Sequence, residues 1–145
     1  MTALTAPKVS TASSLKAGIA AGLIGGLVFG MMMAMMGMLP MVGMLIGVGN
    51  AFVGFIVHMG ISATIGAVYG LVAARLPQSN LITAVAGMVN GIVWWVLGAL
   101  IMMPLMLGMT DMIFHIGTDQ WLSLMGHIIF GLITAFAFVP LSKRL

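Results

Sequence analysis

Four long apolar stretches, separated by short polar segments, dominate the hydrophobic pattern of this sequence. They cover residues 17–39, 51–74, 81–103 and 121–141, and none of them contains Lys, Arg, Asp or Glu. Each stretch is close to the roughly 20 residues that a helix needs to cross the hydrocarbon core of a bilayer. The alternating pattern of a membrane β-barrel is absent, so helices must satisfy the backbone polar groups. We therefore predict an all-α, polytopic membrane protein, a four-transmembrane-helix bundle forming one domain (residues 17–145) after a flexible cytoplasmic tail (residues 1–16).

The composition and the distribution of charge support this prediction. Hydrophobic residues make up 62% of the 145 residues and charged residues only 5%, whereas soluble domains contain about 25% charged residues. Both acidic residues, Asp111 and Asp119, lie between the third and fourth stretches. The basic residues lie before the first stretch, between the second and third, and after the fourth: Lys8, Lys16, Arg75, Lys143 and Arg144. Because basic segments stay on the cytoplasmic side during insertion, we expect a multi-pass protein of the cytoplasmic membrane with both termini in the cytoplasm.

Three classes of alternative are disfavoured by the same observations. The first apolar stretch exceeds the roughly 7–15 residues of a signal-peptide core, so we expect it to be retained as a helix. The net charge of +3 is accounted for by topology and requires no nucleic-acid partner; the expected partner is the lipid bilayer. The absence of cysteine excludes disulfides and thiolate metal sites.

The two halves of the sequence resemble each other. Pro40 corresponds to Pro104, His58 to His127, and the Arg75-Leu76 pair to the final Arg144-Leu145 pair. We therefore predict two duplicated helical hairpins, residues 17–76 and 81–145, related by an axis along the membrane normal. The short turn at residues 76–80 predicts that the second and third helices are antiparallel neighbours.

Small residues recur at every fourth position in the first two stretches. Lipid provides no hydrophobic reason for helices to associate, and such ridges allow close helix packing instead. They fit a compact bundle, and they equally fit a non-catalytic accessory subunit that packs against other subunits or against itself. The ridge residues are Gly18, Gly22, Gly26, Gly30 and Ala34, and then Ser62, Gly66, Gly70 and Ala74.

His58 and His127 are the candidate cofactor-binding residues. Each lies about seven residues into its stretch, which places both roughly 10 Å below the outer edge of the hydrocarbon. Ionisable groups at this depth mark functional sites. Two neutral imidazoles at one depth could ligate the iron of haem b or another metal ion. Alternatively, they donate structural hydrogen bonds, to a carbonyl or to Ser62 or Ser123, or they handle protons.

Methionine is the second candidate for chemistry, since the chain contains 17. Thioethers are soft ligands that bind Cu(I), so a small copper-handling membrane protein is an alternative to haem binding. Flexible methionine also fills irregular gaps in helix packing, and this use requires no ligand. The candidate metal ligands are Met32, Met36, Met103 and Met106.

Other polar residues carry less information. Asn90 is an isolated amide within the third stretch, where an interhelical hydrogen bond is expected. Asp111 and His115 are four residues apart and could interact on a short helix of the outer link. No acidic residue lies within a span, which disfavours a carboxylate-driven transporter. The sequence offers neither a Ser-His-Asp set nor a phosphate-binding loop, so we predict no ordinary enzyme.

Several short motifs lie between residues 51 and 135: His58-Met59-Gly60-Ile61-Ser62, Tyr69, Leu76-Pro77, the segment from Met103 to Thr110, and Gly126-His127. These motifs resemble the YagU-like family of bacterial inner-membrane proteins. The resemblance implies a multi-pass protein of the inner membrane, and the family supplies no activity that could be transferred. This chain departs from the family by its shorter loops and its density of methionine.

Overall fold

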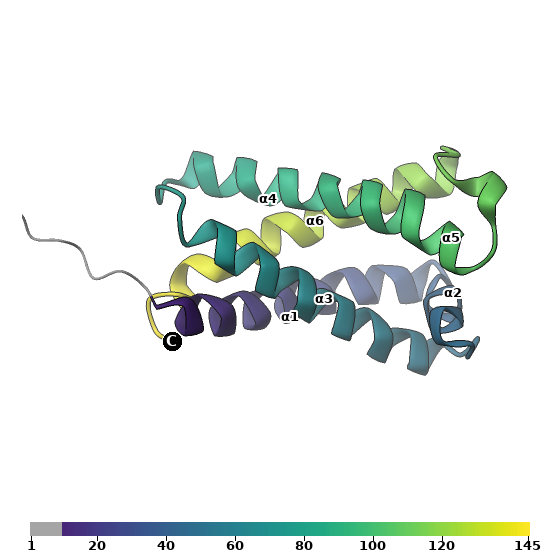
Figure 1. Cartoon of the computed structure of the whole chain (residues 1–145), viewed down its shortest axis with the longest axis horizontal. Helices are drawn as coiled ribbons and strands as arrows, with labels where there is room; N and C mark the ends of the chain where they lie inside the picture. The colour runs from purple at the N-terminus through teal and green to yellow at the C-terminus, as the bar shows by residue number, and fades with distance from the viewer. Residues whose placement is uncertain (1–9) are drawn as a thin grey trace, which may run out of the picture.

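A computed structural model of the chain describes residues 10–145 and shows a bundle of four long helices (Figure 1). The described residues contain no strand, so the predicted all-α four-helix bundle is confirmed. The start of α1 and the C-terminus lie at one end of the bundle, which we call the terminal end. Helices α2 and α5 lie at the other, which we call the loop end (Figure 1). The elements are α1 (Thr11–Met35), α2 (Leu39–Gly43), η1 (Met44–Ile46), α3 (Ala51–Ala73), α4 (Asn80–Trp94), η2 (Trp95–Met102), α5 (Met103–Met106), η3 (Thr110–Met112) and α6 (Thr118–Leu141).

Helix α1 begins earlier than the hydrophobic pattern predicts. The Ser10 side chain accepts a hydrogen bond from the backbone N–H of Ser13 at 3.0 Å and caps the first turn. Residues 11–16 are therefore helical, and their assignment to a flexible tail is wrong. Residues 1–9 of that predicted tail, Lys8 among them, lie outside the described residues.

The same helix also ends earlier than predicted, at Met35 rather than at residue 39. Gly37 adopts a left-handed backbone conformation with φ of 69°, which a helix cannot continue through. The chain then enters α2, where Pro40 occupies the first turn, a position that needs no backbone N–H.

The third span is longer than predicted and is not regular α-helix throughout. It runs from Asn80 to Met106, and residues 95–102 within it form a π-helix. Pro104 explains the irregularity, because it has no N–H to donate to the carbonyl of Leu100, four residues earlier. The N–H of Phe114 donates to that carbonyl instead, at 3.1 Å. The link after α5 therefore folds back onto the helix.

Glycines set the contacts within each of the two helical hairpins. Where α1 meets α3, a Cβ added at Gly22 would lie 2.7 Å from the Cα of Gly66. Where α4 meets α6, a Cβ added at Gly87 would lie 2.7 Å from the carbonyl oxygen of Gly131. The small-residue ridges are thus used inside the chain, between α1 and α3 and between α4 and α6. Helix α1 also packs against α6, and this contact joins the two hairpins.

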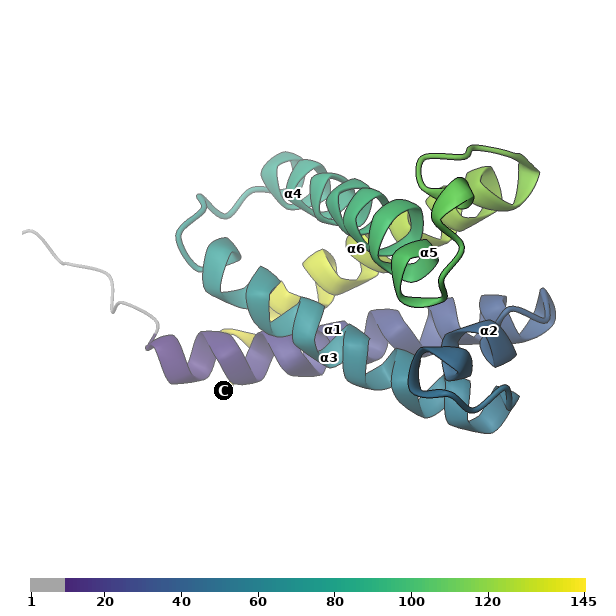
Figure 2. The ribbon, with the colours of Figure 1, turned by 45° about the vertical axis from the view of Figure 1, so that its right-hand side comes forward.

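Helices α3 and α4 are antiparallel but scarcely touch, which contradicts the packing expected from the short turn between them. Figure 2 shows α4 lying along α6 and away from α3. The reason lies in the glycines, since α3 presents Gly66 to α1 while α4 presents Gly87 to α6. A strict two-fold relation between the hairpins would match the α1–α6 contact with an equal α3–α4 contact, and the packing departs from this. Duplication of the sequence stays a prediction.

The distribution of side chains is the reverse of that in a water-soluble bundle. The interior is built largely from Gly, Ala, Ser and a few aromatic residues, while large aliphatic side chains such as Leu27, Ile56 and Val89 are exposed. Four helices are long and apolar enough to cross a membrane: Thr11–Met35, Ala51–Ala73, Asn80–Met106 and Thr118–Leu141. The exposed apolar surface is therefore the lipid-facing surface of a multi-pass protein.

Candidate functional site

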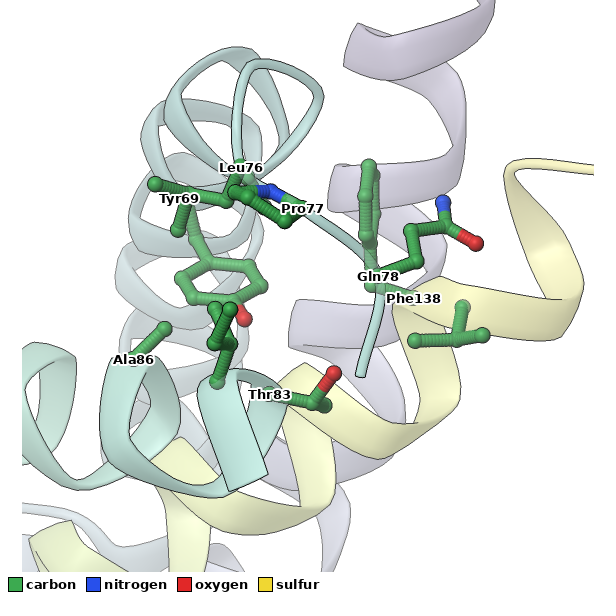
Figure 3. A pocket seen from close by; sticks show the side chains of 10 residues that line it. Tyr69, Leu76, Pro77, Gln78, Thr83, Ala86 and Phe138 are labelled. Carbon is green, nitrogen blue, oxygen red and sulfur yellow. The ribbon is translucent and has the colours of Figure 1, made fainter. Parts of the chain in front are cut away.

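One pocket lies at the terminal end, beneath the turn between α3 and α4 (Figure 3). The ring of Tyr69 meets that of Phe138 edge to face at 5.9 Å, and Pro77 and Gln78 cover them. Its volume is about 20 Å³, which is room for about one water molecule. This pocket is too small for an organic ligand.

His58 lies on the face of α3 that packs against α1, and it is 7% exposed. Its Nε2 atom lies 2.9 Å from the carbonyl oxygen of Gly26. A carbonyl oxygen only accepts hydrogen bonds, so Nε2 carries the proton and donates it. In the neutral imidazole the lone pair is then on Nδ1. The Ser62 hydroxyl lies 3.5 Å from Nε2 and contributes a weaker contact.

His127 on α6 is held in the opposite tautomer. Its Nδ1 atom lies 2.7 Å from the carbonyl oxygen of Ser123, one turn earlier, and therefore donates. The Ser123 hydroxyl lies 3.3 Å from the same nitrogen. The lone pair of this half-buried imidazole is consequently on Nε2. Each histidine thus has its N–H fixed by a backbone carbonyl and one ring nitrogen with a lone pair.

The Phe29 ring brings the two imidazoles into one site. It contacts His58 with 5.4 Å and His127 with 4.8 Å between ring centroids, edge to face in both cases. The neighbouring glycines make room for it: a Cβ added at Gly126 would collide with the phenyl ring, and one at Gly30 would lie 3.1 Å from the His58 ring. We call His58 and His127 the histidine pair.

The arrangement around the histidine pair does not fit a haem. The Nε2 atom of His58 is engaged by Gly26, and the Phe29 ring occupies the place between the imidazoles where a macrocycle would have to lie. A single metal ion requires much less room. The ring nitrogens that carry a lone pair, His58 Nδ1 and His127 Nε2, are the atoms through which the pair would bind such an ion.

The four methionines predicted as metal ligands fall on or next to two elements. Met32 lies on α1 and packs against a cluster that contains Phe29, while Met36 follows the last residue of α1 and lines a cavity at the loop end that Phe29 also lines. Met103 and Met106 belong to α5, which packs against η2 and η3 rather than against α1. In residues 10–145, no group of three or more His, Asp or Glu residues is placed to hold a metal ion.

The remaining polar candidates form no site. Asp111 and His115 are exposed in the link that contains η3. The side-chain nitrogen of Asn90 is buried and, within residues 10–145, has no hydrogen-bond partner. The interhelical hydrogen bond expected of that nitrogen is not made.

Sequence reasoning missed Phe29, which holds the histidine pair together. The signal was present but easily overlooked. Phe29 is the single aromatic residue between Thr11 and Met35, and it continues the face formed by Gly18, Gly22 and Gly26. In a membrane helix, one aromatic residue on a small-residue face points to a contact inside the bundle.

The fold and the lipid-facing surface define the class: the chain is a multi-pass α-helical membrane protein. Comparison with protein families, curated proteins and solved structures finds no match. The resemblance to the YagU-like family stays a prediction, and functional conclusions depend on the histidine pair.

Proposed function

We propose that this protein is a non-enzymatic metal-binding protein of the cytoplasmic membrane, and that His58 and His127 bind a transition-metal ion. The observation that carries the proposal is the hydrogen bonding of the pair. Metal-binding histidines usually donate the other ring N–H to a carbonyl or carboxylate, which fixes the tautomer and orients the lone pair. Both imidazoles have this arrangement, at 2.9 Å and 2.7 Å. Imidazole ligands suit copper, zinc, nickel and iron.

Burial near Phe29 supports a ligand-binding role over a merely structural one. A histidine with a structural role uses its N–H to join two helices. His58 does so, because its hydrogen bond to Gly26 joins α3 to α1. His127 makes no such link, because Ser123 belongs to the same helix. Its hydrogen bond orients the ring without joining two helices. A polar ring placed inside a membrane bundle without a structural task is a functional candidate.

The membrane orientation is part of the proposal. Arg75, Lys143 and Arg144 lie at the terminal end with the start of α1, whereas Asp111 lies in the link at the loop end and Asp119 in the first turn of α6. The distribution of basic residues supports a cytoplasmic terminal end. The histidine pair then lies in the outer half of the bundle.

Metal content tests the proposal. Protein purified in mild detergent is titrated separately with Zn(II), Ni(II) and Cu(I), desalted and analysed for bound metal. We expect the histidine pair to bind one ion of at least one of these metals per chain, so His58→Ala and His127→Ala should each retain one ion fewer than the wild type. His115→Ala is the matched control, because His115 is exposed in a link, and it should bind as the wild type does. Failure of the wild type to retain any of the three ions would refute the proposal. Gel filtration identifies any variant that does not fold.

A further inference from the structure

A second cavity lies at the loop end, between the last turns of α1 and the first turns of α6. Its volume is about 280 Å³. We call it the methionine cavity, and the residues that line it are Phe29, Met33, Met36, Met38, Asp119, Leu122 and Ser123.

The order of these residues along the helices gives the cavity a direction. Met38 and Asp119 lie nearest the links, and Asp119, in the first turn of α6, is exposed. Phe29 and Ser123 lie deepest. Both deep residues touch the histidine pair, because Phe29 contacts both imidazoles and Ser123 holds His127. The cavity therefore leads from the exposed carboxylate to the histidine pair, with Phe29 between them.

The chemistry of the lining favours a soft monovalent cation. Three thioethers are soft donors that prefer Cu(I) over hard ions such as Mg²⁺ or Ca²⁺. The Asp119 carboxylate attracts cations and is the one charged group of the lining. A cavity meant for a purely apolar ligand would gain nothing from a carboxylate. Neutral thioether and imidazole ligands also suit an ion of low charge, since charge within the membrane is costly.

We infer that the methionine cavity binds Cu(I) through Met33, Met36 and Met38, and that the ion moves from there to His58 and His127 when the Phe29 ring rotates. This inference rests on the proposed function, because the histidine pair is the destination. Each step exchanges neutral ligands around Cu(I). Copper stays in the same oxidation state, and no proton is released from thioether or from the lone-pair nitrogens.

Cu(I) affinity measured under anaerobic conditions against a chromogenic chelator tests the inference. The variant Met33→Leu/Met36→Leu/Met38→Leu keeps the apolar volume and removes the sulfur atoms. We expect it to bind Cu(I) at least about tenfold more weakly than the wild type. The matched control is Met41→Leu/Met44→Leu/Met109→Leu, which changes three exposed methionines outside the cavity. The control should retain wild-type affinity, and an equal loss in both variants would overturn the inference.

X-ray absorption of the copper-loaded protein separates this inference from the proposed function. Sulfur and nitrogen ligands are expected together in the wild type, sulfur alone in His58→Ala/His127→Ala, and nitrogen alone in the cavity variant. A wild-type spectrum without sulfur ligands would overturn the inference that the methionine cavity binds Cu(I). It would not contradict metal binding by the histidine pair. A spectrum of sulfur ligands that the histidine substitutions leave unchanged would overturn the histidine pair as the destination.

Discussion

A polar ring buried in a membrane helix costs free energy, and hydrogen bonds to the backbone reduce that cost. In His58 and His127 these bonds use the N–H of each ring and leave the lone pair free. Phe29 then contacts both rings and keeps the site packed. At the residue scale, the apolar ring of Phe29 therefore closes the histidine pair, and under the proposed function this ring has to move before a metal ion binds.

Replacement of Phe29 by Ala separates packing from binding. The change removes a buried ring, which lowers the stability of a packed protein by about 3–5 kcal/mol. It also removes the group that an incoming ion must displace, so we expect tighter metal binding at the histidine pair. Thermal unfolding and metal titration in detergent measure the two effects. Phe136→Ala is the control, because Phe136 is 46% exposed on α6, and it should change neither. Weaker metal binding in Phe29→Ala would contradict the proposed role of the ring.

At the scale of helices, backbone contact replaces side-chain packing. The α1–α3 and α4–α6 pairs meet at glycine, and the large side chains face outward. This arrangement follows from the lipid environment, because transfer of Leu or Ile from lipid to the protein interior gains no hydrophobic free energy. Close contact between backbones supplies the attraction between the helices instead.

Two glycine substitutions on neighbouring helices test this packing. Gly22→Ala places a methyl group 2.7 Å from the Cα of Gly66, so α1 and α3 must separate. We expect a loss of about 1–3 kcal/mol, typical of overpacking. Gly60→Ala is the matched control, because a Cβ there meets nothing within 4 Å, and it should be neutral or slightly stabilising. Equal melting temperatures for the two variants would show that the α1–α3 contact is looser than described.

The π-helical segment supports a separate prediction. Pro104→Ala supplies an N–H that can donate to the carbonyl of Leu100, and it thereby competes with the N–H of Phe114. We expect the third span to become more regular and the Phe114 amide to exchange its hydrogen faster. Hydrogen exchange followed by NMR or mass spectrometry measures this. An unchanged exchange rate at Phe114 would mean that the proline does not cause the irregularity.

At the scale of the whole molecule, the sequence predicts the spans well and their packing poorly. Hydropathy locates four helices because the burial of side chains in lipid depends on polarity alone. It misplaces the ends of α1, since Ser10 and Gly37 act through backbone geometry. The turn at residues 76–80 suggested contact between α3 and α4, but the glycine faces determine which helices meet.

The candidate site was predictable only in part. His58 and His127 stand out in the sequence because imidazoles are rare in apolar spans. Phe29 stands out less, since its signal depends on seeing that it continues the face of Gly18, Gly22 and Gly26. The methionine cavity was beyond prediction because it depends on where α1 ends and α6 begins, which places Met38 near Asp119.

The membrane orientation can be tested with single cysteines, because the chain contains none of its own. Gln78→Cys lies in the turn at the terminal end, and Asp111→Cys lies in the link at the loop end. In intact cells, we expect a membrane-impermeant maleimide to label Asp111→Cys and not Gln78→Cys, because Arg75 keeps its turn inside. If the maleimide labelled Gln78→Cys and not Asp111→Cys, the orientation would be the opposite of the one proposed, and the histidine pair would lie in the inner half of the membrane.

Metal binding by His58 and His127 is measured most directly by the ¹⁵N resonances of the imidazoles in detergent-solubilised protein. The chain has three histidines, so His115 serves as an internal control. Without metal, we expect the proton of His58 on Nε2 and that of His127 on Nδ1, as their carbonyl partners require. One equivalent of Cu(I), or of Zn(II) in a parallel titration, should shift the ¹⁵N resonances of His58 Nδ1 and His127 Nε2. The resonances of His115 should stay unchanged. A metal site at the histidine pair would be contradicted if neither ion changed the resonances of those two nitrogens. It would also be contradicted if only the resonances of His115 changed.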